Sequence, residues 1–286
     1  MPVLSCADEL RAYPVVKQVE IRPAQSDADI DVTLTLTHDA QTRLVVAGSD
    51  AIARAVVRRM VKRALALGGK SQRAGLAIDR TIPDLAPFAL LPLDADPGLP
   101  DLARALQLPM TPHEVAAAVV TGTVRRLDLF RNDRGSVTLH GVLLGGAVAA
   151  HHETQGRPVA WWARIDVDDT ALCDPNEPLL ACAIGNATGY SQLGTLPLLT
   201  AADPTSGTVS VGLAVSVDKE IQVRRAHGRA VSIRLCRAPY ARSLDSAADP
   251  PREQPSVPFT DDGVDGVLRH ACTWWVERAA WALYTE

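Results

Sequence analysis

The stretch Leu44-Val45-Val46-Ala47-Gly48-Ser49-Asp50-Ala51-Ile52 joins an apolar run, a short turn around one acid, and the start of a long helical segment. The apolar run predicts a buried strand, and the residues from Ala51 to Leu67 predict a helix. Such a turn holds a phosphate when bare backbone N–H groups can approach the anion closely. Ser49 and Ala51 carry a Cβ on both sides of Asp50, where close approach favours glycine. The stretch predicts an α/β fold and leaves open whether it forms a nucleotide site or a former one.

Composition excludes several classes of protein. The chain has 286 residues, of which 47% are hydrophobic and 22% are charged, as is ordinary for a globular protein. The net charge of −4 gives no bulk attraction to nucleic acid. No export signal is recognisable, and apolar runs such as Val142 to Ala150 are too short to span a bilayer. The five scattered cysteines indicate reduced, mostly buried thiols, so we expect a cytoplasmic protein.

The part of the chain up to Pro109 has the pattern of an α/β domain. Strand-like runs rich in β-branched or apolar residues occupy Val15 to Ile21, Ile30 to Thr37, Leu44 to Ala47 and Phe88 to Leu93. Gly68-Gly69 closes the helix that begins at Ala51. Asp101 is placed to cap a short helix from Leu102 to Leu108. Thr111 and Glu114 then have the spacing of a capping box before a helix that Gly122 ends.

Beyond Gly122 the pattern changes to β. Strands are predicted at Val124 to Phe130, Ser136 to Leu144, Val159 to Val167, Leu179 to Ile184, Thr208 to Val217 and Arg229 to Cys236. In Thr208 to Val217 the large apolar residues alternate with small or polar ones, so they share one face. Arg237 to Val257 reads as a long loop, and Thr273 to Tyr284 as either a helix or two short strands. Many short strands with turns between them are typical of a sandwich or barrel.

Several segments, taken in their order along the chain, resemble the diacylglycerol kinase catalytic-domain family. These are bacterial lipid kinases related to sphingosine kinases and, more distantly, to NAD kinases. The similar segments are P-D-L-A-R-A-L-Q-L-P at Pro100 to Pro109, Ala116 to Leu129, I-G-N-A-T-G-Y at Ile184 to Tyr190, Ala202 to Val211, and P-F-T-D-D-G at Pro258 to Gly263. The resemblance covers residues 44 to 286.

The resemblance implies a fold and a division into domains. The first domain would be Rossmann-like and truncated, and would comprise residues 1–110 with 268–286. Residues 111–267 would form a mainly antiparallel β-sandwich, with the C-terminal strands returning to the first domain. Family members bind ATP with Mg²⁺ and phosphorylate a lipid hydroxyl. The resemblance further implies a lipid or hydrophobic partner and a homodimer. The net charge predicts no nucleic-acid partner, and a basic helix face described below would allow contact with the membrane surface.

The resemblance also assigns candidate site residues. The family's nucleotide turn falls on Gly48, Ser49, Asp50 and Ala51, and its second nucleotide segment on Asp101. Its catalytic base falls on Asp262, and a metal-binding loop on Asp203.

The departures from the family pattern are extensive. The turn has lost two glycines and a hydroxyl, and Pro100 replaces an asparagine and offers no backbone N–H. Val264 and Ser206 stand where the family has carboxylates. Two functions remain open. The first is a degenerate, pseudokinase form that binds a lipid, another hydrophobic metabolite or a partner protein. The second is an active ATP-dependent kinase that acts on diacylglycerol or a related lipid.

The candidate acids have structural explanations as well. Asp50 can be a turn residue, Asp101 a helix cap and Asp262 part of an acidic turn with Asp261. The helix from Ala51 to Leu67 carries a basic face that would suit either anionic lipid or plain solvent. Its members are Arg54, Arg58, Arg59, Lys62 and Arg63. His151-His152, adjacent on a strand, would point to opposite faces and so make a poor metal site.

Overall fold

The computed structural model describes residues 1–37, 41–67, 76, 79–93, 101–146, 158–186, 192–200, 202–239 and 255–285. The glycine pair 68–69, the acidic loop 94–100, the histidine pair 151–152 and most of the loop 237–257 lie outside these residues. The chain forms two compact units. Unit 1 comprises residues 1–129, 204–207 and 277–286, and unit 2 comprises residues 130–203 and 208–276. The domain bounds given above stay a prediction.

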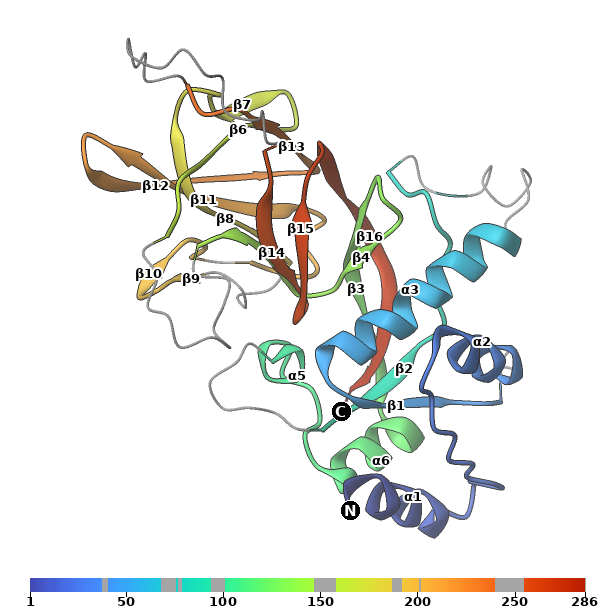
Figure 1. The fold of residues 1–286 in the computed structure, drawn as a ribbon. Coiled ribbons are helices and arrows are strands. Elements are labelled where there is room, and N and C mark those ends of the chain that lie inside the picture. The colour runs from blue at the N-terminus through green and yellow to red at the C-terminus, as the bar shows by residue number, and fades with distance from the viewer. Residues whose placement is uncertain are drawn as a thin grey trace. The chain divides into compact units, whose positions relative to one another are not determined.

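Unit 1 is built on a small parallel sheet. Strands β1 (Leu44–Gly48) and β2 (Phe88–Pro92) pair in parallel with Leu44 opposite Phe88 and Gly48 opposite Pro92. The end of the last strand, β16 (Cys272–Thr285), adds to β2 in parallel, with Leu283 beside Phe88. Figure 1 shows the three strands side by side. The C-terminal strand therefore returns to the first unit, as the resemblance implies.

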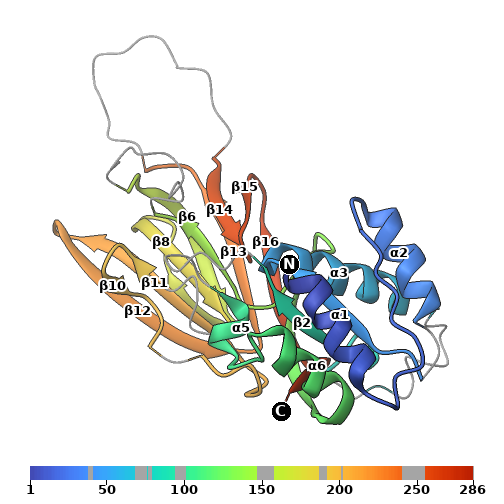
Figure 2. The same ribbon diagram turned by 90° about the horizontal axis from the view of Figure 1, so that it is seen from below.

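Helices cover both faces of this sheet. Helix α3 (Asp50–Leu67) packs on β1 and buries its apolar stripe, which includes Val57 and Val61. Helices α1 (Pro2–Ala12) and α6 (Pro112–Thr121) pack together against β2 in a separate apolar cluster (Figure 2). Alternation along the strands divides the residues between the two faces. The first unit is therefore α/β, as predicted.

The helix starts follow local signals in the sequence. Thr111 and Glu114 form the predicted capping box, and the hydrogen bonds that Glu114 accepts from the N–H groups of Thr111 and Met110 lower its pKa. Asp101 caps α5 (Leu102–Ala105) through the N–H groups of Ala103 and Arg104. Helix α5 is shorter than predicted, and Gln107 beyond it has a φ of +55°.

One predicted strand is wrong. Residues Ile30 to Leu36 belong to helix α2 (Asp27–Leu36) and Thr37 is its C-cap, despite the β-branched composition of this stretch. Ser26 accepts a hydrogen bond from the Asp29 N–H, and Asp27 and Asp29 lie in the first turn, where negative charge is favourable. Val15 to Ile21, also predicted as extended, lies in no strand.

Unit 2 is an antiparallel β structure. Its strands and the strand β3 that leads into it are β3 (Thr123–Asn132), β4 (Val137–Thr138), β5 (Gly141–Gly145), β6 (Trp161–Val167), β7 (Thr170–Cys173), β8 (Pro178–Gly185), β9 (Gln192–Leu193), β10 (Leu196–Pro197), β11 (Val209–Val217), β12 (Glu220–Gly228), β13 (Ala230–Cys236), β14 (Val257–Asp261) and β15 (Val264–Leu268). The central strand β8 pairs with β11 on one side and with β5 and β6 on the other. The predicted strand from Ser136 to Leu144 is interrupted at Leu139 and His140.

One apolar core gathers residues from nearly every strand of unit 2. It includes Val209, Val211, Leu213 and Val215 on one face of β11, as the alternation predicts. The opposite face of β11 is buried too, because Leu198 and Leu199 lie over it. A Cβ on Gly212 would lie 2.3 Å from the Leu198 carbonyl oxygen, so only glycine fits beneath this segment.

The tail of the chain is a strand rather than a helix. β16 is continuous from Cys272 to Thr285, with a backbone irregularity at Ala279, where φ is +49°. Its start pairs with β13. Among the described residues, no helix is long and apolar enough to cross a membrane.

Candidate functional site

The predicted nucleotide turn lies at the carboxyl edge of the parallel sheet in unit 1. β1 ends at Gly48, and α3 begins two residues later at Asp50. The Leu93 N–H, just after β2, donates to the Gly48 carbonyl at 3.2 Å, which joins the two strand ends. Ligands of open parallel α/β sheets bind at this edge. The position therefore suits a ligand site, and the question becomes what the turn can hold.

Hydrogen bonds at the helix start and the side chain of Ile52 restrict access to this turn. The Ser49 carbonyl accepts the N–H groups of Ile52 and Ala53 at 3.0 and 3.1 Å. The Ile52 side chain lies against Gly48, so that a Cβ on Gly48 would stand 2.9 Å from the Ile52 Cβ. A phosphate cradle needs free N–H groups that can be approached closely. The N–H groups of Ile52 and Ala53 are therefore used within the helix start, and the Ile52 side chain fills the space beside Gly48.

The structure does bring Asp50 and Asp101 together. Asp50 Oδ2 accepts the Leu102 N–H at 3.0 Å, and Asp101 Oδ1 accepts the N–H groups of Ala103 and Arg104 at 2.9 and 3.3 Å. Both carboxylates thus accept hydrogen bonds from N–H groups in the first turn of the short helix α5. The buried Oδ2 of Asp101 lies 3.5 Å from Arg104 Nε, beyond an ordinary hydrogen bond. The two acids share one location, and both have structural roles there.

Asp262 occupies the turn between β14 and β15 in unit 2 and has no exposed surface. Its carboxylate accepts three backbone N–H groups, those of Leu139 at 2.6 Å, His140 at 2.9 Å and Gly141 at 3.0 Å. Its own N–H donates to the Gly141 carbonyl at 3.1 Å. These hydrogen bonds fix the two residues between β4 and β5, where the strand is interrupted. A general base needs an accessible lone pair near the reacting proton, and this environment offers none to a bulky substrate.

Other buried polar residues surround Asp262, and of these Thr138, His140 and Asn186 were not among the predicted site residues. Thr138 Oγ1 donates to Asp261 Oδ1 at 2.8 Å, and Asn186 Nδ2 donates to the Leu139 carbonyl at 3.0 Å. The Asn186 N–H reaches the His140 carbonyl at 2.9 Å. The usable signal was polar residues within the apolar runs V-T-L-H-G-V-L-L and A-C-A-I-G-N. Such residues are hydrogen-bonded when they are buried.

Asp203, the candidate metal ligand, is exposed and precedes the turn 204–207. That turn is fixed by Asp128, another residue that the sequence analysis passed over. The Asp128 N–H donates to the Pro204 carbonyl at 2.6 Å, and Asp128 Oδ2 accepts the Gly207 N–H at 2.5 Å. In the described part of the chain, no three His, Cys, Asp or Glu side chains are placed to hold a metal. A metal at Asp203 stays a prediction.

Most of the cysteines are poorly placed to act as nucleophiles. Four of the five, Cys6, Cys173, Cys182 and Cys272, are buried, and all five are free thiols. Burial raises the pKa of Cys173 and of Cys272 to about 12 and also raises the pKa of Cys6 and Cys182. Because the thiolate is the attacking form, burial disfavours a nucleophilic role for these four thiols.

The comparison with solved structures decides the fold. No family model and no curated protein matches the sequence. A crystal structure described as a “putative diacylglycerol kinase” from Bacillus anthracis matches the whole chain with a TM-score of 0.68, at 13% identity and over 91% of its own length. The chain has the diacylglycerol kinase fold. A second structure, called a diacylglycerol kinase from the same organism, matches at a TM-score of 0.65 and 12% identity, over 100% of this chain and 90% of that one. The fold implied by the sequence resemblance is therefore confirmed.

The diacylglycerol kinase fold places the candidate acids but does not by itself give them a role. At 12% to 13% identity, the likeness concerns the fold alone. What the residues can do is set by their own contacts, and each of Asp50, Asp101 and Asp262 is engaged with backbone N–H groups.

Proposed function

We propose that this protein is a degenerate lipid-kinase-like protein, which binds a lipid or another hydrophobic molecule and does not transfer phosphate efficiently. The observation that carries the proposal is the state of Asp262. This acid, at the family's catalytic position, is fully buried, and its two oxygens accept three backbone N–H groups. A carboxylate so engaged organises a turn and is poorly available for proton transfer.

The nucleotide side supports the same proposal. The Ile52 side chain lies on Gly48, where family members would have bare glycine backbone. Because side chains crowd this turn, it does not suit the phosphates of ATP, and no reaction step is assigned to the nucleotide. The lipid class is carried over from the solved structures of the same fold, which are described as diacylglycerol kinases. Dimerisation and contact with the membrane surface remain parts of the proposal taken from the family.

One observation favours the second candidate, an active ATP-dependent lipid kinase. Asp50 and Asp101 meet at the start of α5, at the sheet edge where ligands of this architecture bind. Two carboxylates at one place can hold Mg²⁺ with water completing its shell. In this reading, Asp50→Asn would remove one ligand and abolish activity.

Radiolabelled phosphate transfer to dioleoylglycerol in mixed micelles, with Mg²⁺ and ATP, separates the two candidates. We expect no labelled lipid above the protein-free control, together with a lipid adduct in native mass spectra of the incubated protein. Label in the lipid fraction that disappears in Asp50→Asn would establish the kinase instead. A spectrum without any lipid adduct would contradict the lipid-binding half of the proposal.

A further inference from the structure

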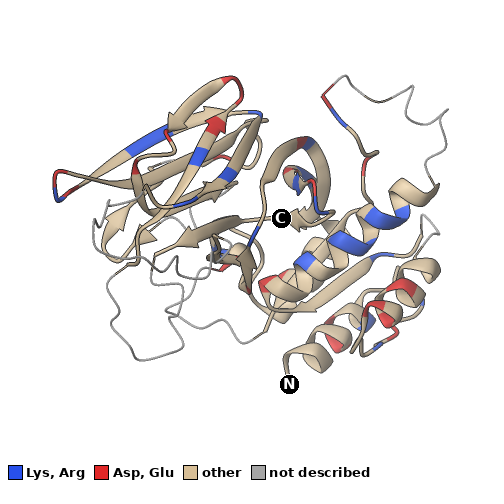
Figure 3. Ribbon diagram, turned by 45° about the horizontal axis from the view of Figure 1, so that its top comes forward, with Lys and Arg blue, Asp and Glu red and all other residues tan. Residues whose placement is uncertain are grey.

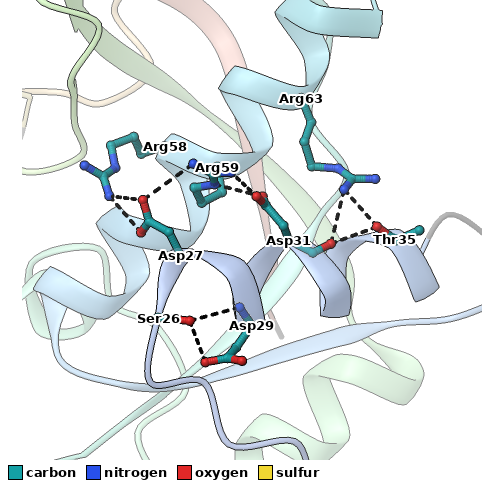
Figure 4. Close-up of polar contacts among 8 residues, drawn as sticks. All are labelled: Ser26, Asp27, Asp29, Asp31, Thr35, Arg58, Arg59 and Arg63. Atoms are coloured by element: carbon teal, nitrogen blue, oxygen red, sulfur yellow. Dashed lines mark hydrogen bonds and ion pairs between the residues drawn. The ribbon is translucent and has the colours of Figure 1, made fainter.

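Helices α2 and α3 of unit 1 are joined by a network of charged groups. Arg58 Nη2 donates to both oxygens of Asp27 at 2.9 Å. Arg59 forms a two-pronged pair with Asp31, with Nε 2.8 Å from Oδ1 and Nη2 on Oδ2, and reaches Asp27 at 3.5 Å. Arg63 Nη1 donates to the Asp31 carbonyl and to Thr35 Oγ1 at 3.1 and 2.9 Å (Figure 4). An acidic helix therefore lies on a basic one.

The two helix faces match because of their spacing. Asp27, Asp31 and Thr35 recur every four residues and share one side of α2. The residues of α3 carry five bases and one acid, whereas those of α2 carry three acids and no base. Figure 3 shows the basic residues along α3 and the acidic residues of the neighbouring helix. The basic face predicted from the sequence is therefore covered by the chain itself over much of its length.

The apolar attachment of α2 is small. Its buried hydrophobic residues are Ile30 and Leu34, while Val32 and Leu36 are 56% and 52% exposed. The segment from residue 13 to residue 26 forms neither helix nor strand, and none of it is buried. Partly exposed ion pairs contribute about 0–1 kcal/mol each. The charged contacts with Arg58, Arg59 and Arg63 therefore make up much of the attachment of α2 to α3.

We propose that α2 is a displaceable acidic cover, and that the basic face of α3 beneath it binds an anionic lipid surface. Guanidinium groups pair with phosphate in the same two-pronged geometry that they adopt here with carboxylate. The apolar stripe of α3 stays packed on β1, so the released face attracts the surface through charge. Each Lys or Arg near an anionic membrane contributes about 1 kcal/mol. The choice of lipid rests on the proposed function, since a lipid substrate lies in a membrane.

The test uses the full chain with Asp27→Asn and Asp31→Asn together. Sedimentation with phosphatidylcholine vesicles containing about a third phosphatidylserine measures binding without nucleotide. We expect the double variant to bind at least about fivefold more tightly than the wild type, and the gain to vanish at high salt. Circular dichroism checks the fold of each variant. Because ATP is absent, the result is independent of any kinase activity.

The matched control is Asp8→Asn with Asp29→Asn. It removes the same charge from unit 1, but Asp8 pairs with Arg11 and Asp29 bonds to Ser26, so neither contacts α3 in the described contacts. We expect this control to stay within about twofold of the wild type, because its basic face remains covered. We call the protein with Asp27→Asn and Asp31→Asn the released variant. Adding Arg58→Gln and Arg59→Gln to it should remove the gain in vesicle binding.

Three results would overturn the proposal. Equal binding by the released variant and the charge-matched control would show that only net charge matters. A gain that survives loss of the two arginines would place the lipid contact elsewhere. Binding of the released variant to duplex DNA but not to vesicles would assign the face to nucleic acid.

Discussion

Replacing Asp262 with alanine is expected to lower the free energy of unfolding by roughly 3–6 kcal/mol. The reason is that three buried N–H groups, those of Leu139, His140 and Gly141, lose their acceptor at once. The backbone adds to the cost, since residue 262 has a φ of +48°, which Asp and Asn tolerate better than alanine. Thermal unfolding should show a midpoint lower by roughly 6–24 °C.

Two comparisons make this result specific to the buried carboxylate. Asp262→Asn keeps one acceptor oxygen and the backbone preference, so its loss should be clearly smaller. Asp265→Ala, on the exposed side of the same hairpin, removes only one exposed hydrogen bond from Thr260 Oγ1 and should lower stability by about 1 kcal/mol or less. An Asp262→Ala protein as stable as the wild type would contradict the structural role and restore Asp262 as a candidate base.

The second large effect is expected for Asp128→Ala, with a loss of about 2–5 kcal/mol. Asp128 is 1% exposed, and its carboxylate accepts the N–H groups of Gly207 at 2.5 Å and Ala279 at 2.8 Å. It therefore fixes β3, the turn 204–207 and the irregular position of β16 together. Residue 279 adopts a φ of +49°, which needs such support.

Denaturant unfolding followed by tryptophan fluorescence measures this effect. Asp128→Asn should fall between the wild type and the alanine variant, because one acceptor oxygen remains. Asp169→Ala, at an exposed turn, serves as a control that removes the same charge. A loss no larger for Asp128→Ala than for Asp169→Ala would mean that the two backbone bonds contribute nothing to stability.

Local signals predicted the fold where they were strong. The apolar run before Gly48, the cap at Asp101 and the capping box of α6 each depend on neighbours within a few residues. The alternation in β11 predicted its inward face for the same reason. The resemblance in segment order then supplied what local pattern could not, the return of β16 to unit 1.

The failures come from a local cap that was not recognised and from contacts between distant residues. Ile30 to Thr37 was predicted as a strand because of its Val, Ile and Thr content, yet Ser26 caps a helix there and arginines from α3 hold it. The edge strand β12 was missed because its exposed, charged residues hide the period of two. Long-range pairing of this kind is not visible in a local window.

In the candidate site, too, the positions of the residues could be predicted and their long-range contacts could not. The positions of Asp50, Asp101 and Asp262 followed from the segment order. The hydrogen bonds that these carboxylates accept could not be predicted in the same way. The N–H groups that Asp262 binds, for example, lie more than 120 residues earlier in the chain. Asp128 was overlooked, although an acid within an apolar strand indicates a buried hydrogen-bonded group.

Thermal unfolding with and without millimolar Mg²⁺-ATP tests the central claim most directly. A ligand at about 100 times its Kd stabilises the native state by about 2.7 kcal/mol, which corresponds to roughly 5–10 °C for a protein of this size. We predict no change in the midpoint, because the Ile52 side chain lies against Gly48 and because Ser49 and Ala51 stand where the family has glycines. A saturable rise with Mg²⁺-ATP that is lost in Asp50→Asn would contradict the account and favour an active lipid kinase.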